Sequence, residues 1–194
     1  GIQEVAPFVE FDHVADLRGE MDTRVVQAGL EVQFRPDGSL EFQVSDQFDR
    51  LESPFTPFTG RTIPVGPYEW REASVEWRSS RARPLYWQAN ATTGGFYDGT
   101  RDSYGTTVTW RARYDFLVEA NYTRNAVTLA SGPFKADVGR LRVRYAWSTR
   151  LFGSAFVQYN AQSSTVVTNA RLNFRYRPLS DIFLVYTDRR DQGT

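Results

Sequence analysis

The sequence predicts an all-β protein, an up-and-down antiparallel transmembrane β-barrel, on three observations. Polar and apolar residues alternate with a period of two in about eleven segments, whereas helical periodicity is nearly absent. Tight reversals alternate with longer connections, as they do in a barrel whose turns on one side are short. Large aromatic residues stand near both ends of the apolar side of the strands, whereas a water-soluble sandwich places its largest aromatics in the core.

Composition and charge narrow the classes of function. Lys plus Arg and Asp plus Glu number 23 each, so the chain lacks the basic excess of a nucleic-acid binder. It has no cysteine, which excludes disulfides, thiolate metal sites and thiol nucleophiles. No window approaches the ~18 consecutive apolar residues that indicate a membrane helix. The mean hydropathy of -0.49 is compatible with a transmembrane barrel, because only every second residue of each strand must face lipid.

The first half of the chain contains five expected strands. The first, at 8–14, is weakly patterned, and the second carries apolar residues at every even position from Val26 to Phe34. Turn residues around Asp37 reverse it, and a Pro, Thr and Gly-rich loop is expected at 51–67. The remaining strands of this half are expected at 40–48, 72–78 and 85–91, with a tight reversal near Arg81 and a loop at 94–102.

The second half is expected to form six more strands, of which the last hairpin is the clearest. In that hairpin Asn169, Arg171, Asn173 and Arg175 define what we call the polar face, and the residues between them define the apolar face. The same alternation assigns both faces in every other strand. The expected strands lie at 103–111, 116–123, 140–147, 151–160, 169–176 and 181–186, with tight reversals near Ala112, Thr149 and Leu179 and a loop at 124–134.

Aromatic residues of the apolar face are expected to form two girdles at the interfaces with lipid. From Leu151 to Tyr159 the strand covers eight steps of ~3.3 Å, and a tilt of ~40° reduces this to about 20 Å, close to the ~25 Å apolar belt of outer-membrane barrels. The girdle beside the tight turns contains Phe34, Trp77, Trp87, Trp110, Trp147 and Tyr176, and the opposite one Phe48, Tyr104, Tyr122, Tyr159 and Tyr186.

Charged residues of the polar face are candidates for lining a lumen. One interpretation is a field across a pore that selects charged solutes at a ladder of arginines. The other is that Arg and Glu pair across the lumen or between neighbouring strands, for instance Glu119 with Arg142. The candidates are Glu72, Glu76, Glu119, Arg140, Arg142, Arg144, Arg171 and Arg175.

Several motifs resemble the C-terminal barrel region of a bacterial envelope family. They are Trp147 to Phe152, Val157 to Asn160, Arg175 to Pro178 and Ser180 to Tyr186, with weaker ones at Phe48 to Leu51, Ile63-Pro64 and Gly94 to Arg101. Members of that family join an N-terminal carbohydrate-binding-module-like domain to an outer-membrane β-barrel. The resemblance implies that residues 1–194 are a single barrel region, incomplete at both ends, of a larger barrel with an even number of strands.

The sequence offers few candidate catalytic residues. His13 is the only histidine, and Glu72 and Glu76 are about 13 Å apart along one strand, too far for the carboxylate pair of a glycosidase. We therefore expect no catalytic residue, no metal and no cofactor.

We expect a protein of the bacterial outer membrane with a structural or transport role and with membrane lipid as its partner. One alternative is a surface-glycan binding or processing protein anchored by its barrel, with aromatic platforms such as Phe96 and Tyr97 in outer loops. Another is a water-soluble β-protein whose apolar face is a core. No nucleic-acid partner is expected.

Overall fold

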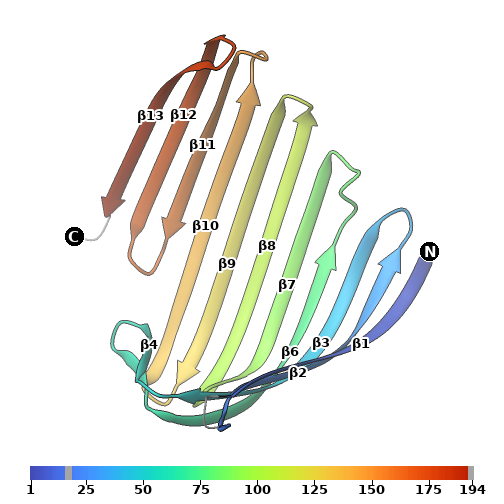
Figure 1. Ribbon diagram of the computed structural model, residues 1–194, viewed down its shortest axis with the longest axis vertical. Coiled ribbons are helices and arrows are strands. Elements are labelled where there is room, and N and C mark those ends of the chain that lie inside the picture. Colours follow the sequence, from blue (N-terminus) through green and yellow to red (C-terminus); the bar gives the residue numbers. More distant parts are fainter. Residues whose placement is uncertain (16–18, 192–194) are drawn as a thin grey trace. The chain divides into compact units, whose positions relative to one another are not determined.

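The computed structural model describes residues 1–15 and 19–191, and in this part of the chain every regular element is a β-strand (Figure 1). None of these residues belongs to a helix long and apolar enough to cross a membrane. The strands are β1 (Ile2–Ala15), β2 (Met21–Phe34), β3 (Gly38–Leu51), β4 (Phe55–Phe58), β5 (Arg61–Ile63), β6 (Gly66–Arg78), β7 (Leu85–Phe96), β8 (Gly99–Arg113), β9 (Phe116–Leu129), β10 (Gly132–Ala146), β11 (Leu151–Asn160), β12 (Thr165–Arg177) and β13 (Ser180–Asp191).

Eleven strands form one up-and-down sheet in the order β1-β2-β3-β6-β7-β8-β9-β10-β11-β12-β13, and β4 pairs only with β5. The all-β class and the up-and-down order are thereby confirmed. The eleven expected strands correspond to those of this sheet, and β4 and β5 are two further strands that were not expected. Among the described residues β1 and β13 stand at the two ends of this order, so the sheet is not closed into a barrel. With eleven strands in up-and-down order, β1 and β13 run parallel, so antiparallel pairing of these two strands cannot close the sheet.

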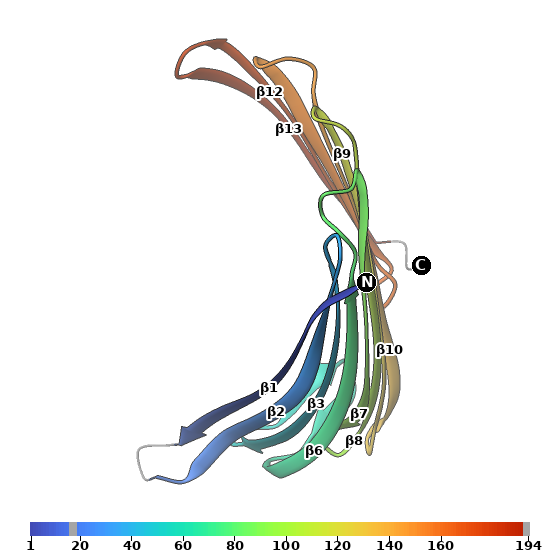
Figure 2. The same ribbon diagram turned by 90° about the vertical axis from the view of Figure 1, so that its right-hand side faces the viewer.

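The chain forms two compact units, and the strands β7 to β10 each contribute residues to both. Unit 1 contains the described residues of 1–79, 89–104 and 125–135, and unit 2 those of 80–88, 105–124 and 136–194. In unit 1, β1, β2 and β3 lie side by side and curve along their length (Figure 2). The pairing of β2 with β3 runs from Thr23↔Asp49 to Phe34↔Gly38 without a shift. Because a slip of one residue exchanges the two faces, this regular register keeps polar and apolar residues apart.

Two segments that were expected to be loops are strands. β7 and β8 are joined by Tyr97 and Asp98 alone, inside the segment expected to be a glycine-rich loop. β9 and β10 are likewise joined by Ala130 and Ser131 alone, within the expected loop 124–134. Pairing with neighbouring strands overrides the low strand propensity of Gly and Asn that suggested loops. The expected alternation of short and long connections is therefore wrong at these two positions.

The third expected loop, 51–67, contains β4 and β5, which form a hairpin over the polar face of unit 1. Ile63 of this hairpin is fully buried, and Arg61 donates from Nη1 to the carbonyl oxygen of Ser131 at 2.7 Å. Its apolar partners stand at polar-face positions, so the hairpin gives this end of the face a small core. We call this the hairpin core; it consists of Ile63, Val127 and Leu129 with Leu51, Tyr68, Phe96, Tyr97 and Phe134 packed against them.

Candidate functional site: the polar face of the sheet

In this sheet polar side chains are buried and large apolar side chains are exposed, which is the reverse of a water-soluble sheet. Among the described residues the only buried hydrophobic side chains are those of the hairpin core, whereas Val44 and Leu184 on the apolar face are 56% and 69% exposed. Folding in water leaves large apolar side chains exposed only singly or in small patches. Polar residues are buried instead, and apart from Ser80 they lie on the polar face: Ser39, Ser45, Glu72, Thr109, Thr165 and Asn173.

The aromatic residues expected at lipid interfaces all lie on the apolar face. In unit 2 four rings form a row with centroid distances of 6.1 Å from Trp110 to Phe116, 5.8 Å from Phe116 to Tyr145 and 4.7 Å from Tyr145 to Trp147. Edge-to-face contacts of this kind stabilise aromatic pairs. Contact with lipid stays a prediction. Trp87, Trp110, Trp147, Tyr176, Tyr122, Tyr159 and Tyr186 are exposed, and Trp77 packs against Phe34 at 5.6 Å.

The apolar face of unit 1 ends in a group of ion pairs that the sequence interpretation missed. Arg24 Nη2 lies 2.8 Å from Asp46 Oδ1 and 2.6 Å from Glu69 Oε1. Arg71 Nε lies 2.8 Å from the other oxygen of Asp46. These four residues follow the aliphatic residues of β2, β3 and β6 on the same face, so this face is apolar over only part of each strand. We call Arg24, Asp46, Glu69 and Arg71 the ion-pair belt.

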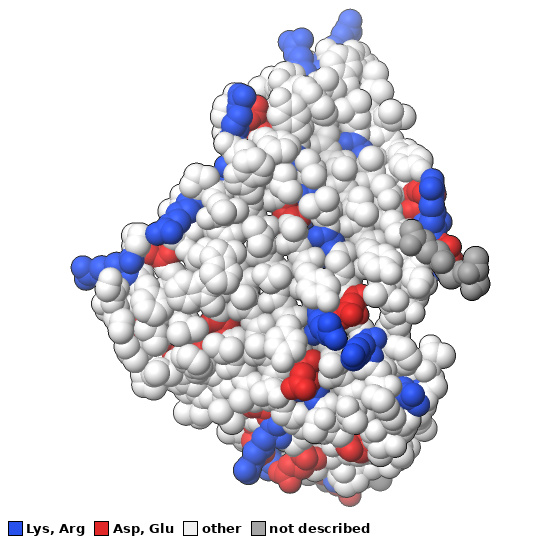
Figure 3. Space-filling model, turned by 180° about the vertical axis from the view of Figure 1, so that it is seen from behind, with Lys and Arg blue, Asp and Glu red and all other residues white. Residues whose placement is uncertain are grey.

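Figure 3 shows the molecule from the side opposite to the view of Figure 1. Most of this surface is uncharged, and a group of acidic and basic side chains lies within its lower half, with further charged side chains toward its margins. In unit 2 the corresponding pairs on the apolar face join Arg124 to Asp137 at 3.8 Å and Arg190 to Asp188 at 2.6 Å. In both units the charged residues of the apolar face therefore lie beyond the aliphatic stretch, on the remaining part of the same strands.

Glu72, a predicted lumen residue, is buried and fully paired within unit 1. Its Oε1 accepts a hydrogen bond from Arg101 Nη2 at 2.5 Å, and its Oε2 accepts one from Gln47 Nε2 at 2.9 Å. The Arg101 guanidinium also lies 4.8 Å from the centroid of the Phe96 ring. Burial makes an unpaired carboxylate costly, so this network fixes β3, β6 and β8 to one another. Arg101 escaped the sequence interpretation because it fell in an expected loop.

Other predicted lumen residues are also paired. In unit 1 Glu76 Oε1 accepts from Arg78 Nε at 2.5 Å. In unit 2 Arg142 Nη1 lies 3.6 Å from Glu119 Oε1, which is the pair that the second interpretation of the charges named. The remaining contacts join Arg140 Nε to Gln158 Oε1 at 3.1 Å and Arg175 Nε to Asp181 Oδ1 at 3.1 Å. Glu76, Glu119, Arg142 and Arg175 thus each have an oppositely charged partner, and Arg140 is held by a neutral amide.

Arg144 and Arg171 of unit 2 differ from the other candidates. Within residues 1–15 and 19–191 neither guanidinium has a hydrogen-bond or ion-pair partner, and Arg171 lies 4.3 Å from the centroid of the Phe183 ring. Arg144 is in register with Ser154, which is in register with Arg171, so the three form a row across β10, β11 and β12. The row borders a cavity of about 650 Å³.

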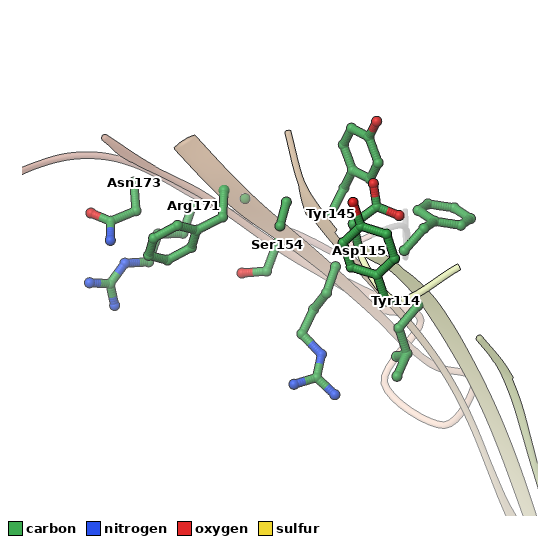
Figure 4. Close-up of a pocket in the computed structure, with 12 residues that line it drawn as sticks. Tyr114, Asp115, Tyr145, Ser154, Arg171 and Asn173 are labelled. Atoms are coloured by element: carbon green, nitrogen blue, oxygen red, sulfur yellow. The ribbon is translucent and has the colours of Figure 1, made fainter. Parts of the chain in front are cut away.

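Figure 4 shows how this cavity is built. Ser154, Arg171 and Asn173 project on one side of the ribbon and Tyr145 on the other, as alternation along a strand requires. Asn173 is 6% exposed, and its Oδ1 accepts no hydrogen bond from any described residue. The sequence interpretation placed Asn173 on the polar face but had no signal for its burial. Arginines without acidic partners beside polar groups can bind an anion.

The described part of the chain contains no candidate metal site, because no three acidic or histidine side chains in it are grouped closely enough to hold an ion. Comparisons of the chain with protein-family models, curated proteins and solved structures found no match. The family resemblance inferred from the motifs therefore stays a prediction.

Proposed function

We propose that this chain forms part of the wall of a β-barrel in a bacterial outer membrane, with its apolar face toward lipid and its polar face toward a lumen. The role in the envelope is structural or transport-related. The inverted burial of the two faces carries the proposal. In lipid, exposure of Val, Leu and aromatic side chains is favourable, whereas in water the same surface promotes aggregation.

The limits of the apolar face support the same function. In β2 the aliphatic stretch from Val26 to Phe34 covers eight steps of ~3.3 Å, which a tilt of ~40° reduces to about 20 Å of membrane thickness. The ion-pair belt begins at Arg24, on the same face directly before this stretch. Arginine and carboxylate groups are costly in hydrocarbon and favourable at the headgroups, so the belt stands where such a wall meets water.

The two alternatives have weaker support. A water-soluble protein with an apolar core requires a cover for the apolar face, and no described residue provides one. A glycan platform requires free aromatic rings, whereas Tyr97 packs against Trp70 at 4.6 Å and against Phe96 at 5.0 Å in the hairpin core. No observation favours catalysis.

Fractionation of the full-length protein from the bacterium that produces it tests membrane insertion. We expect the protein to stay in the outer-membrane pellet through extraction with alkaline carbonate and with urea, and to dissolve only in detergent. Release into the soluble fraction without detergent contradicts the proposal.

Cysteine labelling tests the orientation of the faces, since this chain has no cysteine of its own. Val157 and Gln158 are neighbours on β11 and lie on the apolar and the polar face respectively. In intact membranes we expect Val157→Cys to react only with a lipid-soluble maleimide and Gln158→Cys to react with a water-soluble one. Equal labelling of both positions by the water-soluble reagent contradicts a lipid-facing wall.

A further inference from the structure

We infer that the row Arg144, Ser154 and Arg171, together with Asn173, is a binding site for a small organic anion, a carboxylate or phosphate monoester with an apolar body. This inference deepens the proposed function and rests on it in one respect: the site then faces the lumen. The cavity, the two unpaired guanidinium groups and the buried Asn173 are independent observations that converge on one place.

The spacing of the row suits one oxyanion held between two arginines. Adjacent strands lie ~4.8 Å apart, so the backbones at Arg144 and Arg171 are separated by about 10 Å, with Ser154 between them. In this structure the Arg171 guanidinium lies over the Phe183 ring of β13, on the side of β12 away from Arg144, so both arginines reach one oxyanion beside Ser154 once the Arg171 side chain turns toward it. Guanidinium donors form short, charge-assisted and often bidentate bonds with carboxylate and phosphate oxygens, and the Ser154 hydroxyl supplies one further donor.

The local charge favours an anion over a cation or a zwitterion. The side chains that border the cavity include Arg144, Arg171 and one carboxylate, that of Asp115. Asp115 lies 3.2 Å from Arg113, so its charge is already compensated. Two positive charges therefore remain without a counterion among the described residues. Of the other predicted lumen arginines in unit 2, Arg142 is held by Glu119, Arg140 by Gln158 and Arg175 by Asp181.

The unpaired atom of Asn173 is its Oδ1, an acceptor, so the site also favours a hydrogen-bond donor on the ligand, such as a hydroxyl group or a protonated phosphate oxygen. A buried amide without a partner costs about 1–3 kcal/mol, which a ligand recovers when it supplies the missing bond. Asn173 stands two residues from Arg171 on the same face of β12, so one ligand reaches both. The apolar side chains of Leu117 and Phe152 also border the cavity and offer a surface for the hydrocarbon body of the ligand.

Titration of the detergent-purified full-length protein tests this site. The probes are benzoate, its neutral analogue benzamide, phenyl phosphate and inorganic phosphate, and heat is measured by isothermal titration calorimetry. We expect benzoate and phenyl phosphate to bind at least tenfold more tightly than benzamide, and inorganic phosphate more weakly than phenyl phosphate. Equal affinity for benzoate and benzamide, or absence of binding by all probes, overturns the inference.

Substitutions locate the binding. Arg144→Gln and Arg171→Gln should each weaken benzoate binding about tenfold, a change of ~1.4 kcal/mol. Arg142→Gln is the matched control, because Arg142 lies on the same strand and face but is paired with Glu119; it should change affinity less than twofold. An equal loss in all three variants overturns the inference, since it indicates general electrostatic attraction. Unchanged circular dichroism shows that each variant is folded.

The outcome is separable from that of the proposed function. Calorimetry on the detergent-purified protein measures binding whether or not the protein inserts in a membrane. Carbonate extraction of the membranes from which the protein is purified measures insertion whether or not the anion binds. Binding by a protein that is released from the membrane retains the site and refutes the lumen. Membrane insertion without anion binding supports the barrel wall and refutes the anion-binding site.

Discussion

Arginine substitutions on the two faces of one strand distinguish a wall in lipid from a sheet in water. Phe42 and Gln43 are neighbours on β3, and Phe42 lies on the apolar face with 49% of its surface exposed. Phe42 is in register with Leu30 of β2 on one side and with Val75 of β6 on the other. Leu30 is the middle residue of the aliphatic stretch of β2, so Phe42 lies at the same height in the wall. An arginine in the middle of the hydrocarbon costs about 2–4 kcal/mol in transmembrane barrels. Phe42→Arg should therefore raise the equilibrium constant of unfolding by roughly 30-fold to several hundred-fold.

The expected effect of Gln43→Arg is small, because its side chain faces the polar side. In water both substitutions replace surface side chains, and such changes usually alter the free energy of unfolding by less than about 0.5 kcal/mol. The assay is urea unfolding of the full-length protein in phospholipid vesicles, followed by tryptophan fluorescence and by heat-dependent gel mobility. Similar shifts for Phe42→Arg and Gln43→Arg, or a neutral Phe42→Arg, refute the assignment of the apolar face to lipid.

Three further predictions concern positions that the structure singles out. Gly99→Ala should destabilise the protein by about 1–3 kcal/mol in urea unfolding, because its added Cβ overlaps a backbone carbonyl of β9, whereas Gly139→Ala, which adds its Cβ in open space, should be nearly neutral. Ile63→Ala should cost about 2–5 kcal/mol and speed proteolysis of residues 52–65, whereas alanine at the exposed Val65 should do neither. Burial raises the pKa of the Tyr97 phenol above its ordinary value, so its contribution to stability is present at neutral pH and is lost as pH rises above ~10. Tyr97→Phe should remove that alkaline loss in unfolding curves measured at several pH values, and an unchanged alkaline loss contradicts the assignment.

The sequence predicted strands well where each face has one kind of surroundings along its whole length. The strand expected at 151–160 is observed as Leu151–Asn160, because its apolar face carries no charged or polar side chain from Leu151 to Tyr159, although Phe152 and Phe156 stand on its polar face. β9 was expected to end at 123 but continues to Leu129. There the hairpin core covers the polar face, so Val127 and Leu129 are apolar where the alternation demands polar residues. Where the environment of one face changes from solvent to protein core, the alternation of polar and apolar residues is lost, and the sequence is then misinterpreted as a loop.

Membership of the polar face could be predicted for every candidate arginine, but its ionic partners could not. Alternation alone places Arg142 and Arg144 on one face of β10. Whether either meets a carboxylate depends on the register with β9, and that register brings Glu119 to Arg142 and no acid to Arg144. The burial of Asn173 depends in the same way on neighbours from other strands. Long-range register is not encoded in the period of a single strand.

The hairpin of β4 and β5 has a consequence for the kinetics of folding. Every other neighbouring pair in the large sheet joins consecutive strands, so most pairings close short loops and form without long chain searches. The step from β3 to β6 must close residues 52–65, which costs roughly 1.5–2 kcal/mol more in chain entropy than a two-residue turn. Burial of Ile63 helps to offset that cost, but only once β9 has supplied Val127 and Leu129. Completion of the early part of the sheet thus depends on a strand from the middle of the chain, which sets an order on an otherwise local assembly.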